Sequence, residues 1–401
     1  MDYKNTATRM DATEMTVLSM TRAGLLGEKC RIDPQTDWSK LFSISYRQGI
    51  INIIYRALKL SAADIPSDYL RLFQAEALKN IRTDYQQRAE LKILFQRFEE
   101  EGIRYLPIKG ILIKNLYPRP ELRWMSDADI IIDHSVSDQI VSVMEKLGYS
   151  YKNESLHEQT WEKCGFQVEM HTSALSRTYS FYNDYFSDPF LLAEHAGGMC
   201  YHFSGDDMLL YSVCHLAKHY LNDFGNLRNV IDLYYLLQEP GINQEHVERV
   251  LKEWRLEEFF HILRETVDDW FSGTEMGEKS LLLLGHILKN SEENSERQIF
   301  ARRLARYGER GNRRSRGLKF RYLLTSLFPT LQEMRLVYPV LKHLPFLLPF
   351  FWIWRIAYGL FFNRSHVKRF VDTSFRYSEA VIEQYMKEAE AVGLQDMVTQ
   401  G

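Results

Sequence analysis

Two aspartates separated by one residue open the segment best suited to chemistry. Asp127 and Asp129 come just before a run of apolar residues, Ile130 to Ile132, that predicts a buried β-strand. Side chains two residues apart on a strand point to the same face, so the two carboxylates should lie side by side. Like charges this close repel, and we expect each carboxylate to raise the pKa of the other unless a divalent cation neutralises them. Hard oxygen ligands of this kind suit magnesium or manganese.

A third carboxylate lies in a later segment of alternating polarity. Glu169 and His171 share one face of a predicted strand, while Val168 and Met170 share the other. If this strand pairs with the strand of the two aspartates, three carboxylates converge, as two-metal phosphoryl transfer requires. His171 either orients Glu169, touches a nucleotide or is a hydrogen-bonded structural histidine. The predicted catalytic and metal-binding residues are therefore Asp127, Asp129 and Glu169.

Basic residues and a glycine precede this acidic group. Lys109 and Gly110 follow the short apolar run 104–108 and open a predicted helix. A glycine at this position allows backbone N–H groups to approach a phosphate at the helix N-terminus, and Lys109 would add a point charge. Arg123, four residues before Asp127, has the guanidinium geometry for a bidentate phosphate contact.

The surrounding pattern predicts an α+β fold, with a small mixed sheet embedded in a mostly helical chain. Apolar periodicity is helical up to Gly102, which should end the last of these helices. Short β-rich runs then alternate with helices until about residue 176, and helical periodicity returns afterwards. The predicted regions are 1–102 (helical), 103–176 (the core with the mixed sheet), 177–330 (helical) and 331–401 (an apolar segment and a C-terminal helix). Strands are predicted at 104–108, 130–132, 149–152 and 166–170, and later helices at 206–221, 227–237, 246–254, 258–270, 279–288 and 296–307.

The order of these motifs resembles a known family. The run LPIKGILIKNLYPRPELRWMSDADIII, the helix ending LGY and the later VEMH are similar to the uncharacterised nucleotidyltransferase family of bacteria. The resemblance implies a polymerase-β-like fold that transfers a nucleoside monophosphate from a nucleoside triphosphate to an acceptor, with Mg²⁺ or Mn²⁺. The wider superfamily usually has Gly-Ser where this chain has Lys109 and Gly110, and Ala128 replaces a commoner Ile or Leu.

A looser resemblance extends over CHLAKHYLNDFGNLRNVIDLYYLL. His215, Lys218 and His219 share a helix face, which either contacts a phosphate or acceptor, binds a metal or is simply polar. Arg228 and Asp232 fall at i and i+4 on the next predicted helix, where a plain intrahelical ion pair is the simplest interpretation. Trp124, by its position, is either a core aromatic residue or a platform for a base. The resemblance implies that the predicted nucleotide-binding residues are Lys109, Gly110, Arg123, His171, His215, Lys218 and His219.

Composition excludes several other classes of protein. The formal net charge is −3, so no global field indicates nucleic acid or membrane. The four cysteines form no CxxC pair, which argues against a zinc ribbon or a disulfide framework. The N-terminal residues lack the apolar core of a secretory signal. These features predict a cytoplasmic protein, with peripheral attachment to a membrane as an alternative.

Two C-terminal segments carry their own hypotheses. The arginine-rich run Arg302–Arg321 could bind RNA or anionic lipid, or form a solvated, ion-paired face. Leu344–Phe362 is strongly apolar, but Pro345, Pro349 and Arg355 argue against a transmembrane span, so it should pack on the protein or lie at an interface.

Three functions remain for comparison with the structure. The first is an enzyme that transfers a nucleotide to an unknown acceptor. The second is a non-catalytic nucleotide- or partner-binding protein that retains the fold, and the third acts at a membrane surface. Three convergent carboxylates favour the enzyme, because a binding module has no need of them.

Overall fold

The computed structural model divides the chain into two compact units. The first contains residues 1–220 and 224–291, and the second contains residues 221–223 and 292–401. The predicted helix 296–307 and the arginine-rich run 302–321 lie outside the described residues. The described residues are 10–61, 65–154, 158–175, 182, 184–289, 324, 327–362 and 379–400.

A seven-stranded mixed sheet forms the centre of the first unit, and the α+β prediction is confirmed. Its strand order is β3-β4-β5-β2-β1-β7-β6. The central strands β2 and β5 run parallel, while β1 is antiparallel to β2. The strands are β1 (Tyr105–Pro107), β2 (Asp127–Ile132), β3 (Ser150–Glu154), β4 (Glu158–Lys163), β5 (Phe166–His171), β6 (Glu194–Gly197) and β7 (Cys200–His202).

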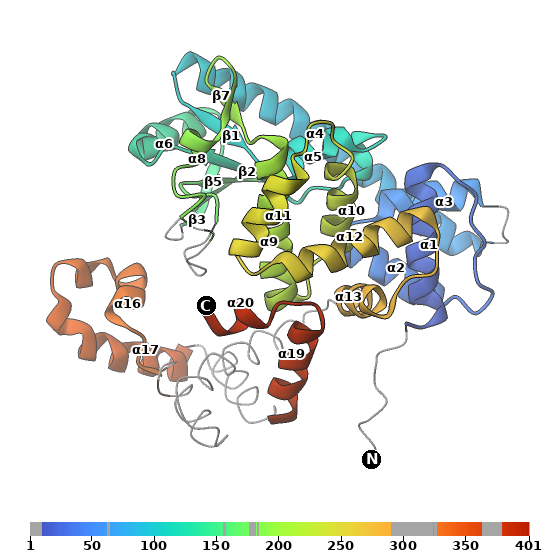
Figure 1. Ribbon diagram of the computed structural model, residues 1–401. Coiled ribbons are helices and arrows are strands. Elements are labelled where there is room, and N and C mark those ends of the chain that lie inside the picture. The colour runs from blue at the N-terminus through green and yellow to red at the C-terminus, as the bar shows by residue number, and fades with distance from the viewer. Residues whose placement is uncertain are drawn as a thin grey trace. The chain divides into compact units, whose positions relative to one another are not determined.

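One face of this sheet is sealed by two helices (Figure 1). The alternate residues Ala128, Ile130 and Ile132 of β2, with Val168 and Met170 of β5, are buried in the apolar core. Side chains of α4 (Ser67–Glu100) and α6 (Ser137–Lys146) fill the rest of that core. The period of two along a strand therefore directs the acidic residues of β2 and β5 to the opposite face.

Helices before and after the sheet are tied together within the first unit. The Gln48 side chain donates to the Ile287 carbonyl and accepts from the Leu227 amide, and Trp270 donates to the Leu18 carbonyl. The predicted boundaries at 102 and 176 therefore separate segments that pack as one body. The helices of this unit outside the sheet cover are α1 (Ala12–Leu26), α2 (Trp38–Arg47), α3 (Ile51–Leu60), α5 (Gly110–Ile113), α8 (Pro189–Leu192), α9 (Gly205–Asp223), α10 (Leu227–Leu236), α11 (Gln244–Glu253), α12 (Glu257–Ser272) and α13 (Glu278–Leu288).

Glycine in the left-handed conformation ends the helix before the sheet. Gly102 has φ of 65°, directly after α4, which is the stop that the sequence predicts. The predicted strands at 104–108, 130–132, 149–152 and 166–170 correspond to β1, β2, β3 and β5. The prediction that strands end near residue 176 is wrong, because β6 and β7 extend the sheet beyond β1.

The second unit is helical in its described part. It contains α16 (Leu331–Val337), α17 (Leu348–Phe362), α19 (Glu379–Ala391) and α20 (Gln395–Gln400), with 3₁₀ turns at Pro339–Lys342 and Pro345–Leu347. The predicted apolar segment 344–362 thus becomes one 3₁₀ turn and α17. Among the described helices, none combines the length and the apolar character needed to cross a bilayer.

Candidate active site

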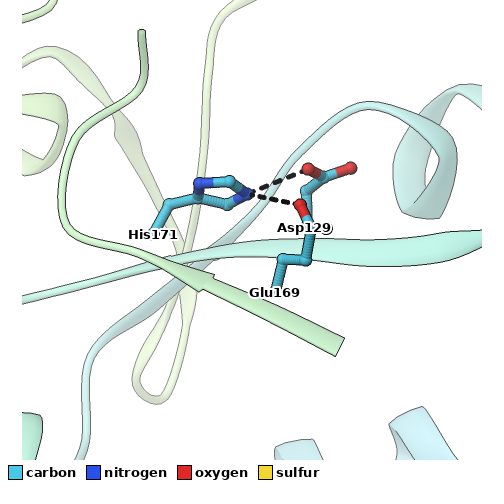
Figure 2. A group of neighbouring side chains, drawn as sticks. All are labelled: Asp129, Glu169 and His171. Carbon is cyan, nitrogen blue, oxygen red and sulfur yellow. Dashed lines mark hydrogen bonds and ion pairs between the residues drawn. The ribbon is translucent and has the colours of Figure 1, made fainter. Parts of the chain in front are cut away.

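Asp129 and Glu169 face each other across the two central strands. The register of the parallel pair β2–β5 sets Asp129 directly beside Glu169 and Asp127 beside Gln167. His171, two residues further along β5, points the same way, and its Nε2 lies 2.9 Å from Asp129 Oδ1 and 3.5 Å from Glu169 Oε2. Figure 2 shows the imidazole turned toward both carboxylates. The predicted pairing of the two acidic strands is therefore present.

These three side chains form a group that can hold a metal ion. One ligand atom from each of Asp129, Glu169 and His171 lies within 4.8 Å of the others. The two carboxylates supply hard oxygen atoms, which fit magnesium or manganese, and an imidazole is also a good ligand for manganese or other transition metals. The donor chemistry thus fits the divalent ion that the sequence predicts.

Asp127 lies at the open end of this group. It begins β2 and shares the face of Asp129, but it is partly exposed, whereas Asp129 is buried. Its Oδ1 accepts a hydrogen bond from Ser126 Oγ at 2.8 Å. Asp127 is therefore not one of the three groups in mutual contact, although it is two residues from Asp129 on the same strand face.

Lys109 reaches the same carboxylate from the turn after β1. It directly precedes α5, after β1, and its Nζ lies 2.5 Å from Asp129 Oδ1. Its backbone has φ of 52° and ψ of −125°, a left-handed conformation that side-chain-bearing residues rarely adopt. Strain of this kind costs roughly 1–3 kcal/mol and is typical of functional sites. The turn after β1 therefore holds Lys109 over the acidic residues at a cost in backbone energy.

The sequence predicts that Asp129 is surrounded by acidic groups, but in the structure basic groups also contact it. Burial disfavours the ionised carboxylate, but the Lys109 ammonium and the hydrogen bond from His171 outweigh burial and hold the pKa of Asp129 well below its usual range. The expectation that neighbouring acids raise this pKa is therefore wrong. It failed because the sequence pattern did not indicate two cationic groups converging on Asp129.

His171 is held between acids on three strands. Burial disfavours its imidazolium form, yet hydrogen bonds to Asp129 and Glu169 outweigh burial and raise the pKa of His171. On the other side of the ring, Nδ1 lies 3.8 Å from Glu158 Oε2 on β4. His171 thus orients the carboxylates through direct contact, which agrees with one of the alternatives left open by the sequence.

Arg123, the predicted phosphate contact, has a buried carboxylate as its partner in this structure. It is buried, and its Nε and Nη2 donate to the two oxygens of Asp232 at 3.0 and 2.6 Å. The Tyr117 hydroxyl donates to the same carboxylate at 2.7 Å. Two nitrogens of the Arg123 guanidinium donate to Asp232, so Arg123 links the loop before β2 to α10. The predicted intrahelical pair between Arg228 and Asp232 is replaced by this long-range pair.

The close approach of Arg123 explains why residue 110 is a glycine. A Cβ atom at Gly110 would lie 2.3 Å from Arg123 Nη1, a distance that no real side chain tolerates. The first turn of α5 therefore packs directly on the guanidinium. Gly110 opens a helix, as predicted, and its close contact is with Arg123.

Arg228 and Trp124 form a second contact between α10 and the loop. Arg228 Nη1 donates to the Trp124 carbonyl at 2.9 Å, and the guanidinium lies 5.3 Å from the centre of the indole ring. Trp124 is partly buried, and this cation–π contact occupies the ring. The geometry favours a structural role for Trp124 over a platform for a base.

Helix α9 adds a row of polar side chains beside Lys109. Tyr211, His215 and His219 fall at i, i+4 and i+8, with ring centres 5.9 and 4.3 Å apart. Burial lowers the pKa of His215 well below its ordinary value, and the nearby charges of His219 and Lys109 act in the same direction. His215 is therefore neutral beside the site, with Lys218 close to it.

The sequence of the chain matches a known protein family. Residues 34–272, more than half of the chain, match the family described as uncharacterised nucleotidyltransferase. The chain belongs to the uncharacterised nucleotidyltransferase family. The matched region of this family member includes the whole sheet, the acidic group and helix α9. No curated protein and no solved structure matched the chain.

Two residues at the site of this nucleotidyltransferase family member were absent from the predicted set. Glu158 lies on β4, a strand whose residues carry too little apolar alternation to be recognised. Tyr211 is buried, and both Lys109 and Asp129 act electrostatically on its hydroxyl. Its spacing of four from His215 was the available signal, because residues i and i+4 share a helix face.

Proposed function

We propose that the protein is a metal-dependent nucleotidyltransferase that moves a nucleoside monophosphate from a nucleoside triphosphate to an acceptor. The observation that carries this proposal is the side-by-side position of Asp129 and Glu169 on parallel strands, with His171 in contact with both. In the proposed reaction, a nucleophilic atom of the acceptor bonds to the α-phosphorus, and the bond from that phosphorus to the bridging oxygen breaks. Pyrophosphate leaves with the electron pair.

The carboxylates of Asp127, Asp129 and Glu169 would hold the metal ions. When bound there, divalent ions would stabilise the negative charge that develops on the phosphoryl oxygens. His171 fixes the direction of Asp129 and Glu169 through hydrogen bonds, as supporting residues of metal ligands generally do. Asp127, nearer to solvent, is suited to a ligand shared with the incoming triphosphate.

Lys109 is the basic residue we assign to the triphosphate. Its ammonium contacts Asp129, and the hydroxyl of Tyr211 on α9 lies near it. A lysine at this position can exchange its contact with the carboxylate for a phosphate oxygen, because an ammonium group offers three donors. His215 adds an uncharged hydrogen-bonding group, while Lys218 and His219 continue the polar face of α9.

The test is a direct search for transfer. The full chain is incubated with each of the four labelled ribonucleoside triphosphates, magnesium or manganese, and a lysate as the source of acceptors. We expect pyrophosphate release and a nucleoside monophosphate adduct, detected by mass spectrometry on a protein, an RNA or a small molecule. Absence of pyrophosphate release with every triphosphate and both metals, although triphosphate binds, would favour the non-catalytic binding protein.

Metal binding should be visible without any acceptor. Magnesium or manganese is expected to raise the melting temperature of the wild-type protein, since a ligand at 100 times its Kd stabilises the folded state by about 2.7 kcal/mol. Glu169→Gln should remove most of this shift. Glu162→Gln on the adjacent β4, which pairs with Lys152, is the matched control and should retain it. An equal shift in all three proteins would contradict the assignment of Glu169.

Lys109→Ala should weaken triphosphate binding more than it weakens the fold. Loss of a charge-assisted hydrogen bond of about 1.5–3 kcal/mol predicts roughly 10- to 100-fold weaker binding of a non-hydrolysable triphosphate by calorimetric titration. Lys79→Ala, an exposed lysine on α4 paired with Glu76, is the control and should bind with wild-type affinity. Equal affinity in wild type and Lys109→Ala would limit Lys109 to neutralising Asp129.

A further inference from the structure

Helix α17 in the second unit has one face packed on its own unit. Trp352 donates from Nε1 to the Pro329 carbonyl at 2.9 Å, and its ring lies 5.4 Å from that of Phe328. Phe351 packs on Tyr338 with ring centres 4.5 Å apart. These contacts fix the rotation of the helix about its axis, so they also determine which side chains point outward.

The outward face of α17 is apolar and aromatic. Phe350, Ile353, Trp354, Tyr358 and Phe361 are each more than half exposed, at 58, 68, 52, 53 and 69%. With 100° between successive residues, these positions fall within one continuous arc of the helix. Phe346, in the 3₁₀ turn just before α17, is also exposed, at 72%. Contiguous apolar surface of this kind marks a site of interaction.

The sequence that contains and flanks α17 has one sign of charge. Residues 334–371 contain no aspartate or glutamate, although the whole chain has a net charge of −3. Arg355 is exposed and lies next to the apolar arc. The basic residues of this segment in the described part of the chain are Arg335, Lys342 and Arg355.

We propose that the outward face of α17 binds the surface of an anionic phospholipid membrane, with the helix lying in the plane of the interface. Aromatic and aliphatic side chains would enter the boundary between headgroups and acyl chains, and the basic residues would contact anionic headgroups. The charge argues against a second copy of this chain, because two such segments would bring like charges together. The apolar arc, with Phe350 and Phe361 at its centre and no basic residue among the exposed positions that form it, argues against RNA, which needs basic groups among its stacking residues.

The test is sedimentation of the full chain with vesicles of phosphatidylcholine alone or mixed with phosphatidylglycerol. The key variant combines Phe350→Gln, Trp354→Gln and Phe361→Gln, which alters exposed positions and should leave the fold intact. We expect wild type to bind the anionic vesicles, high salt to weaken binding, and the variant to bind at least about tenfold more weakly. The matched control replaces the exposed α4 residues Leu78, Tyr85 and Ile93 with glutamine and should bind like wild type.

Each other outcome overturns the proposal. Equal binding of wild type and the α17 variant, or equal loss in the α4 control, would remove α17 from the contact. No binding to anionic vesicles, together with α17-dependent dimerisation in analytical ultracentrifugation, would assign the face to a second copy. No vesicle binding, together with α17-dependent binding of a single-stranded RNA, would assign it to RNA. The transfer assay is independent of all these results, so the proposed enzymatic function stands or fails separately.

Discussion

Asp129→Asn is expected to reduce nucleotidyl transfer by at least about a thousandfold. A metal ion contributes several kcal/mol of charge stabilisation in phosphoryl transfer, and about 4 kcal/mol corresponds to a thousandfold in rate. Glu169, His171 and Lys109 all lie around Asp129. Replacing its carboxylate with a neutral amide therefore removes the central negative charge of the group. The measurement is the rate of pyrophosphate release with saturating triphosphate and magnesium.

The same substitution should also lower stability in the absence of metal. The sequence alone suggested the opposite, because removal of one of two neighbouring negative charges relieves repulsion. In the structure Asp129 is instead the counter-ion of Lys109 and a hydrogen-bond partner of His171. Asparagine would leave both cationic groups without that charge, so we expect a lower melting temperature in buffer that contains a chelator.

Asp133→Asn is the matched control for this experiment. Asp133 follows the other end of β2, is partly exposed and pairs with Arg104 at 2.6 Å, away from the acidic group. Its substitution should leave transfer at the wild-type rate. If Asp129→Asn turns over like wild type while it is folded, Asp129 is not a metal ligand in the reaction, and the proposed function loses its main support.

The acidic group was predictable because it depends on short-range periodicity. The spacing of Asp127 and Asp129, and of Glu169 and His171, determines which side chains share a face. The isoleucines after Asp129 and the alternation around Val168 identified the two strands as buried elements. What remained was the register, and the structure aligns Asp129 with Glu169.

The strand β4 was not predictable on the same grounds. Trp161 is its one large apolar residue, and it packs opposite Val168 in the core. The turn to β5 is made by Cys164 and Gly165, both with positive φ, which is the geometry of a tight hairpin without its usual Asn-Gly or Asp-Gly sequence. Glu158 could not be assigned to the site without this strand.

Long-range ion pairs were equally inaccessible from the sequence. Arg123 looked suited to a phosphate because it precedes the aspartates, and Asp232 looked like a partner of Arg228 because of its helical spacing. Their contact joins residues that are 109 positions apart. Only the packing of α10 against the loop before β2 brings them together, and single-sequence periodicity carries no information about that packing.

Asp232→Asn is expected to destabilise the protein by about 3–5 kcal/mol, the usual effect of breaking a buried ion pair. Both side chains of the Arg123–Asp232 pair are 6% exposed, so the remaining guanidinium would be left in the interior without its counter-charge. The Tyr117 hydroxyl would also lose its charged acceptor. The measurement is the free energy of unfolding from urea denaturation, followed by a signal from the first unit.

Two further variants distinguish this structural role from the nucleotide contact that the sequence suggested for Arg123. The double variant Arg123→Met, Asp232→Leu replaces the pair with apolar groups of similar volume and should recover much of the lost stability. Asp68→Asn removes the exposed partner of Arg71 on α4 and should change stability by less than about 0.5 kcal/mol. If Asp232→Asn is as stable as Asp68→Asn, the pair does not hold the loop. If the double variant is stable and binds triphosphate with wild-type affinity, Arg123 acts only through Asp232, because a direct phosphate contact would have been lost with its guanidinium.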